Sequence, residues 1–329
     1  MTIAALPNIV ADIGGTNARF AICESGTYEI HDEQQLRCGD FSNIDSAIRI
    51  YLELVGERRP LGEAAIAIAA PVMGDEIALT NNHWRFSATA MRKSLGLKRL
   101  IVVNDFTALA MAIGHLPSRD LVQVGGEAQT STAPIALVGA GTGLGVSGLI
   151  HAGDQWIPLQ GEGGHVSIAP GDAREAAVLM TLWRRFKHVS AERVLSGTGL
   201  VNLYTALCEL DDVPILPYRA EHVTEHGVSG SCAQCKEALS MFCGLLGSVA
   251  GNLVLTLGAT QAVYVGGGIV PRLGQYFLES PFRSRFEDKG RYVDYLKPVP
   301  AYVIHSPYPA FIGLSRSFVT PGPRFEVSE

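Results

Sequence analysis

The sequence predicts an α/β protein made of two domains, and three features support this prediction. At 329 residues the chain is long for one domain and can bury a substantial core. Hydrophobic residues make up 47% of the chain and charged residues 18%, with 36 glycines, which is typical of a compact α/β protein. A pattern of strand, glycine-rich turn and returning strand occurs twice, which indicates a repeated domain.

The two glycine-rich hairpins span Val10–Ile22 and Ala136–Ile150. Glycine allows positive φ and a close approach to the main chain, and neighbouring N–H groups can form an anion-binding nest. Phosphate is the ligand that this arrangement favours, and Thr16 and Thr142 add hydroxyl donors at matching positions. Either turn alone could be an ordinary hairpin, and the repetition favours phosphate binding. The turn glycines are Gly14, Gly15, Gly141, Gly143 and Gly145.

Asp12 ends the first predicted strand, where its carboxylate could provide an oxygen to a phosphate-bound Mg²⁺, directly or through water. Neither turn is a Walker A loop, because Gly-Lys occurs nowhere in the chain. The sequence therefore predicts a phosphate site on another kind of nucleotide-binding fold.

Strand and helix patterns alternate along the rest of the chain. In the first half they predict a helix over Asn43–Val55, a buried strand over Ala64–Ala70, a strand over Leu100–Asp105 and a helix over Phe106–Ile113. In the second half they predict a loop over Gly161–Gly171, helices over Ala173–Phe186, Ala191–Val194 and Val201–Leu207 (the last preceded by Gly197 and Gly199), a third glycine turn within Val263–Ile269, a last strand over Tyr302–His305 and a terminal helix over Gly313–Phe318.

Polar residues at two of these places are candidates for chemistry. Asn104 and Asp105 stand at a strand's carboxyl end, where ligands gather in open α/β sheets. Asp105 could accept a proton from an attacking hydroxyl in phosphoryl transfer, although Asp is also a favoured helix N-cap. Glu162 and His165, separated by two glycines, could hold adjacent sugar hydroxyls, or be ordinary surface residues. Glu192 by itself fits a solvated helix position.

The stretch Ala238–Pro271 contains no charged residue, so its length alone could nominate a membrane span. Polar residues dilute it and it ends in a strand, so we predict a buried helix instead. Gly244, Gly247 and Gly251 share one face of that helix and would let it lie close against a sheet.

Charge and cysteine content limit the classes of partner. The net charge of −6 provides no broad basic field for nucleic acid or membrane lipid, which favours small ligands. The N-terminal segment lacks the basic head of a signal peptide, and six scattered cysteines suit a reducing compartment, so a cytoplasmic location is expected. Cys232 and Cys235 form a C-x-x-C pair without a completing second pair, which favours structural thiols over a metal site.

Five motifs in this order resemble the bacterial glucokinases: Asp12–Arg19, Val103–Phe106, Gly141–Gly145, Glu162–His165 and Glu192–Gly197. The resemblance implies two ribonuclease-H-like domains of the actin-like ATPase superfamily, which close an interdomain cleft over ATP and sugar. The expected limits are 1–112 plus 303–329 for a small domain and 113–302 for a large one. The cysteine-rich zinc motif of the ROK group is missing, which places the chain with the zinc-free branch.

The resemblance also implies roles for individual residues. Asp105 would be the general base for the 6-hydroxyl of glucose, with Mg²⁺ near Asp12. Residues expected at the sugar are Asn104, Glu162, His165 and Glu192, together with Pro71 in the loop Ala70–Val72 and Asn82 in the loop Thr80–Asn82. Residues expected at ATP are Gly14, Gly15, Thr16, Asn17, Gly141, Thr142 and Gly143 at the phosphates, and Gly266, Gly267 and Gly268 on the adenosine side.

Two other functions remain open on this sequence. A kinase for another hexose would use the same aspartate and phosphate turns, with Glu162 and His165 deciding the sugar. A non-catalytic sugar sensor would bind sugar without transfer, although it would not need a general base at Asp105. Because related kinases are often dimers, a homodimer is expected.

Overall fold

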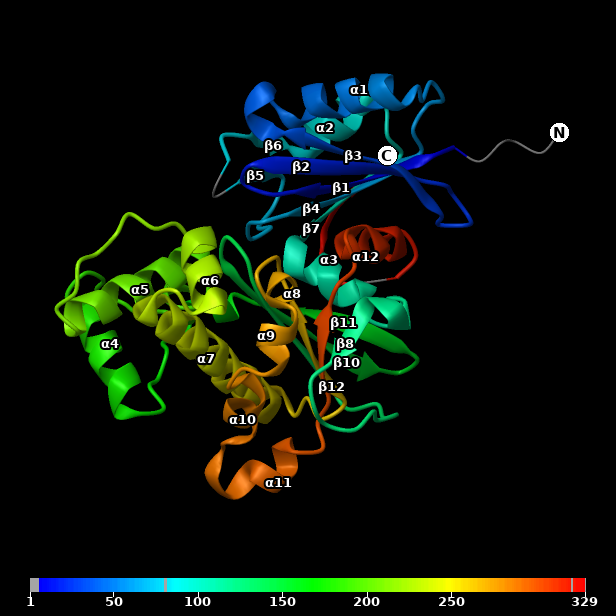
Figure 1. Cartoon of the computed structure of the whole chain (residues 1–329). Helices are drawn as coiled ribbons and strands as arrows, with labels where there is room; N and C mark the ends of the chain where they lie inside the picture. The colour runs from blue at the N-terminus through cyan, green and yellow to red at the C-terminus, as the bar shows by residue number, and fades with distance from the viewer. Residues whose placement is uncertain (1–5, 80–81, 321, 329) are drawn as a thin grey trace. The chain divides into compact units, whose positions relative to one another are not determined.

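The computed structural model describes residues 6–79, 82–320 and 322–328. The chain divides into two compact units, drawn in Figure 1. The first holds the chain up to Pro117, Gln155–Gln160 and the chain from Ser306 onward, and the second holds Ser118–Asp154 and Gly161–His305. Two six-stranded mixed sheets form the framework, so the predicted α/β class with two domains is confirmed.

The first sheet has the strand order β14-β7-β4-β1-β2-β3. Strands β1, β4 and β7 are parallel, and Ile13, Ile68 and Asn104 are aligned across them. The carboxyl ends of these three strands therefore meet at one edge of the sheet, beside the first glycine turn. The strand bounds are β1 (Asn8–Ile13), β2 (Asn17–Cys23), β3 (Ile30–Arg37), β4 (Glu63–Ile68), β7 (Arg99–Asn104) and β14 (Phe325–Ser328).

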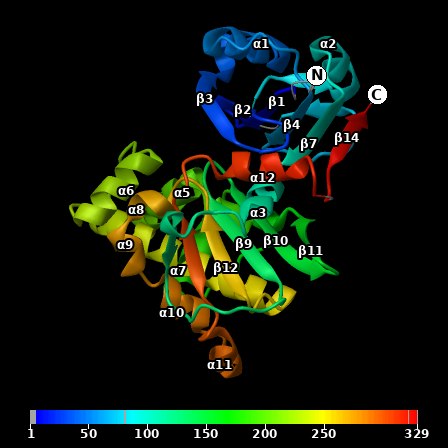
Figure 2. The same ribbon diagram turned by 90° about the vertical axis from the view of Figure 1, so that its right-hand side faces the viewer.

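Helices cover both faces of the first sheet (Figure 2). Residues alternate between the faces, so Ile9, Ala11 and Ile13 join the core under α1 and α2, whereas Val10 joins the core under α3 and α12. The remaining elements of this unit are α1 (Ile44–Val55), α2 (Ala88–Leu95), α3 (Asp105–Ala112), α12 (Pro309–Ser317), the hairpin β5 (Glu76–Ala78) and β6 (Arg85–Ser87), and the 3₁₀ turn η1 (Cys38–Asp40).

The second sheet has the order β11-β10-β9-β12-β13-β8, with β9, β12 and β13 parallel. Its strands are β8 (Leu121–Gln123), β9 (Ile135–Ala140), β10 (Leu144–Ala152), β11 (Gln155–Gln160), β12 (Ala262–Gly266) and β13 (Ala301–Ile304). The helices of the second unit are α4 (Ala173–Trp183), α5 (Gly197–Leu210), α6 (Ala220–Ser229), α7 (Ala233–Leu257), α8 (Val270–Leu273), α9 (Gln275–Leu278), α10 (Phe282–Glu287) and α11 (Val293–Leu296), with 3₁₀ turns η2 (Ser118–Asp120), η3 (Gly163–His165), η4 (Ala191–Arg193) and η5 (Gly290–Tyr292).

Helix α7 carries the long uncharged stretch, and the prediction of a buried helix is confirmed. It is long and apolar enough to cross a membrane, but 67% of its most apolar window is buried inside the protein. The expected partner of its glycine face was wrong, because these glycines face helix α10 rather than a sheet (Figure 1). A Cβ at Gly247 would overlap the carbonyl oxygen of Phe282, and one at Gly251 would overlap that of Phe286.

Most predicted elements are present, and three of them differ in type or extent from the prediction. Tyr302–His305 is not the last strand, because the four-residue strand β14 follows and pairs with β7. Ala191–Arg193 forms a 3₁₀ turn rather than a longer helix. Gly197 and Gly199 lie inside the first turn of α5, where a Cβ on Gly199 would overlap the backbone of Val194.

Candidate active site

The first glycine turn, between β1 and β2, is held by hydrogen bonds to its backbone. The Gly14 N–H donates to the Asn17 carbonyl (2.9 Å), and the Gly14 carbonyl accepts from Asn82 Nδ2 (3.3 Å). The Thr16 carbonyl accepts from the Cys38 N–H (2.8 Å), while the Thr16 side chain is exposed. Two neighbouring segments thus fix the turn and leave its threonine facing solvent.

A pocket of about 470 Å³ opens beside this turn. It is lined by Gly15, Thr16, Arg37, Cys38, Gly39, Asp40, Asn82 and His83. Arg37 lies directly across from Asn17 in the pairing of β2 with β3, and it lines this pocket together with residues of the turn. Sequence reasoning missed Arg37, Cys38, Asp40 and His83, because no glycine motif or strand-end pattern marks them.

Asp12 lies opposite Arg19 in the β1–β2 pairing, and Arg19 Nη1 donates to Asp12 Oδ2 at 2.9 Å. Burial raises the pKa of Asp12, and the charge and hydrogen bond of Arg19 partly offset this rise. Among the residues that the structure describes, no group of three or more His, Cys, Asp or Glu side chains could hold a metal ion. Asp12 offers a single carboxylate near the end of β1, and carboxylate oxygen is a ligand type that hard cations such as Mg²⁺ prefer.

Asn104 and Asp105 lie at the junction of β7 and α3, at the same sheet edge as the first turn. Asn104, rather than Asp105, is the N-cap of α3, and its Oδ1 accepts from the N–H groups of Phe106 (2.9 Å) and Thr107 (3.2 Å). Asp105 is the first helical residue, half-buried, and its Oδ1 accepts from the Phe106 N–H at 2.9 Å. The positive end of α3 favours a carboxylate at this position.

The second glycine turn, between β9 and β10, is held by Glu192. Glu192 Oε2 accepts from the Leu144 N–H at 2.9 Å and leaves no room for a Cβ on Gly143, which would lie 2.5 Å from it. The Gly197 N–H, which has no partner within its own helix because it starts α5, donates to the Gly141 carbonyl at 2.9 Å. Thr142 at the tip is exposed.

Glu162 is the N-cap residue of the turn η3 and His165 is its last residue, and η3 packs on strand β10. A Cβ on Gly164 would overlap the Leu144 carbonyl, and one on Gly163 would lie 2.8 Å from Val146 Cβ, so both glycines are needed for this packing. Glu162 and His165 are both exposed, and η3 contacts the turn η4 that carries Glu192. The structure thus brings Glu162, His165 and Glu192 together around the second hairpin.

Gly266, Gly267 and Gly268 follow or end β12, next to the same hairpin. Gly267 has φ +81°, and a Cβ there would overlap the Ala140 carbonyl. A Cβ on Gly139 would lie 2.6 Å from the backbone of Gly266. Two strand ends therefore pack backbone against backbone, with Gly267 and Gly268 exposed.

The remaining predicted sugar residues belong to the first unit. Asn82 lies beside the first turn, and its Oδ1 also accepts from the Trp84 N–H at 3.1 Å. Pro71 is exposed in the loop after β4. Thr80 and Asn81, expected in a sugar loop, lie outside the described residues.

Comparisons with known proteins agree with these motifs. Residues 9–320 match the family model described as Glucokinase. A glucokinase of Chromobacterium violaceum is 52% identical over 312 residues, which are 94% of this chain and 89% of that protein. The solved structure of a glucokinase from an Antarctic psychrotroph matches with a TM-score of 0.82 and 34% identity, covering 94% of this chain and 98% of that one.

A more distant match shows the fold alone. The structure of a ROK family glucokinase from Streptomyces griseus, solved with glucose and AMPPNP, has a TM-score of 0.63 and 19% identity, covering 94% of this chain and 98% of that one. With nearly the whole sequence covered by the family model and by a relative more than half identical, this chain belongs to the glucokinase family.

Proposed function

We infer that this chain is an ATP-dependent glucokinase, which transfers the γ-phosphate of ATP to the 6-hydroxyl of glucose and releases glucose 6-phosphate and ADP. Membership of the glucokinase family supports the reaction. The observation that supports the mechanism is the alignment of Asn104 with Ile13 across β1, β4 and β7, because Asp105 and the first glycine turn then follow strands that end at the same sheet edge.

Asp105 is the proposed general base. Its carboxylate accepts the proton of the sugar 6-hydroxyl as that oxygen attacks the γ-phosphorus, and the bond to the ADP oxygen breaks. Because Asn104 supplies the helix cap, Asp105 is not required for it, which supports a chemical role for the carboxylate.

Backbone N–H groups and exposed hydroxyls of the two turns are proposed to hold the phosphates. Gly14, Gly15, Thr16 and Asn17 would act from the first turn, and Gly141, Thr142 and Gly143 from the second; Gly266, Gly267 and Gly268 would contact the adenosine. Asp12 would hold Mg²⁺ through water, and the bound ion would neutralise phosphate charge. Arg19 supports this role, since it holds Asp12 Oδ2 in place.

The sugar hydroxyls are proposed to bind Asn104, Glu162, His165 and Glu192, with Asn82 and Pro71 on loops nearby in the sequence. Glu162 and His165 are exposed on a rigid glycine-packed turn, as ligand-binding side chains should be. Glu192 uses Oε2 for the Leu144 N–H, so Oε1 is the oxygen proposed for sugar. We also propose a homodimer in the cytoplasm. The proposed domain limits are 1–112 plus 303–329 for the small domain and 113–302 for the large domain.

The test is phosphate transfer from MgATP to a panel of hexoses by wild type and Asp105→Asn, with glucose binding measured in parallel. A general base is worth about 10²–10⁴ in rate, so transfer should fall by that factor while glucose still binds. Asp172→Asn is the matched control, because Asp172 is also an acidic residue at a helix start but caps α4 in the second unit.

Two alternatives would appear as different outcomes. Preference for another hexose would keep the mechanism and change the substrate. Tight glucose binding without transfer by the wild type would favour a sugar sensor and overturn the kinase.

A further inference from the structure

Helix α7 begins with two cysteines whose sulfurs interact. Cys232 is the N-cap of this 25-residue helix, and its Sγ accepts from the Cys235 N–H at 3.4 Å. Residues three apart at a helix start are neighbours, and a C-x-x-C pair at such a start is the arrangement that disulfide-exchanging proteins use.

The two thiols differ in exposure. Cys232 is partly exposed, whereas Cys235 is completely buried. Burial, together with the neighbouring Cys232, raises the pKa of Cys235 to about 12. A reagent from solvent therefore meets Cys232 first, and Cys235 can react only with a sulfur that is already next to it.

A third thiol lies close to this pair. Cys208 on α5 is buried and close enough to Cys232 and Cys235 for their charges to interact. A structural metal does not account for the three sulfurs, because the part of the chain that the structure describes holds no cluster of three metal-ligating side chains. All six cysteines are in the thiol form in this structure.

We propose that Cys232 and Cys235 are a reversible dithiol/disulfide site that reacts with small disulfides, with Cys232 as the entry thiol. The Cys232 thiolate attacks one sulfur of a disulfide RSSR, the S–S bond breaks, and one RSH leaves after taking up a proton. The Cys235 thiol then attacks Cys232 Sγ, the mixed disulfide breaks, and the Cys235 proton passes to the departing RS⁻, which leaves as the second RSH. The protein loses two protons and two electrons, and RSSR gains both.

The site is separate from the residues proposed to bind glucose and ATP. None of the three thiols lies in η3, η4 or the glycine turns. Cys235 packs under α6, where its carbonyl would be 2.9 Å from a Cβ on Gly227. The pair therefore sits in the helical layer formed by α5, α6 and α7, and its chemistry can be measured without turnover.

The test uses the full-length reduced protein with oxidised glutathione as the probe. At set times the remaining thiols are alkylated under denaturing conditions, and intact mass with peptide mapping locates every modified sulfur. The wild type should lose two of its six alkylatable thiols through a Cys232–Cys235 bond and regain both with dithiothreitol.

Three variants assign the roles. Cys232→Ser keeps an N-cap acceptor and should stay folded, but it should form an internal disulfide at least tenfold more slowly. Cys235→Ser should stop at one glutathione attached to Cys232. Cys243→Ala, on the same helix but with its thiol at Ser280, is the matched control and should oxidise like the wild type.

Three results would overturn the proposal. One is a wild type that keeps all six thiols while a small dithiol in the same solution is oxidised. The second is a wild type that stops at a persistent glutathione adduct, because Cys235 would then fail to resolve it. The third is a wild type in which Cys208 forms a disulfide with Cys232 or Cys235 as fast as Cys232 and Cys235 form one with each other.

Discussion

The two glycine hairpins have similar sequences but different supports. Each places an exposed threonine at its tip and a parallel strand beside it. Polar side chains hold the first hairpin, through the Asp12–Arg19 ion pair and Asn82. The second is held by backbone packing and by Glu192, which occupies the space that a side chain at Gly143 would need. Glycine is therefore a packing requirement in the second hairpin more than in the first.

The substitution with the largest expected effect disrupts the backbone packing of the second hairpin. In Gly139→Ala the new Cβ would lie 2.6 Å from the Gly266 backbone, and backbone cannot move aside as a flexible side chain can. Such overpacking should lower the free energy of unfolding by about 3 kcal/mol. Gly14→Ala is the matched change in the first hairpin, where the nearest atom is the Asn17 carbonyl oxygen at 3.3 Å, and should cost about 1 kcal/mol or less.

Urea unfolding of both variants measures this difference. Equal losses of stability would contradict the distinction between a packed and a polar hairpin.

Substitutions of Glu192 can distinguish its role in holding the second hairpin from a role in sugar binding. Glu192→Gln keeps an oxygen for the Leu144 N–H, so its stability should stay within about 0.5 kcal/mol of the wild type. Glu192→Ala leaves that N–H unpaired and should cost about 1–3 kcal/mol. If Oε1 also binds sugar, both variants should raise the KM for glucose. An unchanged KM in Glu192→Gln would limit Glu192 to anchoring the hairpin.

Asp12 tests whether the polar support of the first hairpin serves function more than stability. Burial raises the pKa of Asp12, so the ionised carboxylate lowers the stability of the folded protein. This destabilisation is absent below the pKa of Asp12 in the unfolded chain, because the carboxyl group is then protonated in both states. Asp12→Asn removes that charge but also the Arg19 pair, whose side chains are 36% and 21% exposed. We expect a stability change of about 1 kcal/mol or less, together with a higher Mg²⁺ requirement for transfer. A large destabilisation with unchanged Mg²⁺ dependence would refute this view.

Local patterns made the hairpins and α7 predictable, because glycine turns and apolar periodicity are read within a few residues. Asn104 and Asp105 were placed at the correct strand end, but the predicted helix began at Phe106, one residue late, because Asn and Asp both favour the cap position and local patterns do not fix the boundary. The bond from Glu192 to Leu144 spans 48 residues, so no local pattern reveals it. For the same reason the glycine face of α7 was matched to a sheet instead of α10.

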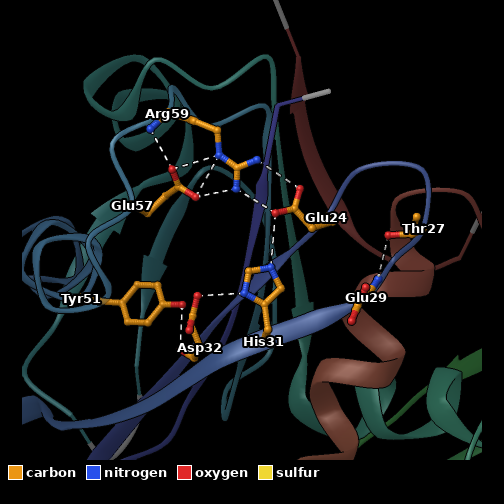
Figure 3. A network of polar contacts seen from close by, with 8 residues as sticks. All are labelled: Glu24, Thr27, Glu29, His31, Asp32, Tyr51, Glu57 and Arg59. Atoms are coloured by element: carbon orange, nitrogen blue, oxygen red, sulfur yellow. Dashed lines mark hydrogen bonds and ion pairs between the residues drawn. The ribbon is translucent and has the colours of Figure 1, made fainter. Parts of the chain in front are cut away.

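The first hairpin also has polar support at the end of β2 away from its turn (Figure 3). Glu24, directly after β2, accepts from Arg59 Nη2 at 2.8 Å and contacts His31 Nε2 at 3.3 Å, while His31 Nδ1 contacts Asp32 Oδ2 at 2.8 Å. Burial lowers the pKa of His31, but the hydrogen bonds and charges of Asp32 and Glu24 outweigh this and raise it overall.

This network gives the smallest predicted effect, a pH dependence of stability. Because the folded pKa of His31 is raised, its contribution is fully present below the unfolded pKa of about 6.5 and is lost as the pH rises through the folded pKa. The imidazole is 37% exposed, so solvent screening should limit the change to about 0.5 kcal/mol. Thermal unfolding from pH 5 to 8 should show this loss in the wild type but not in His31→Gln. If the same pH dependence persists in His31→Gln, it comes from titratable groups other than His31. The polar network at the end of β2 would then not distinguish the first hairpin from the second.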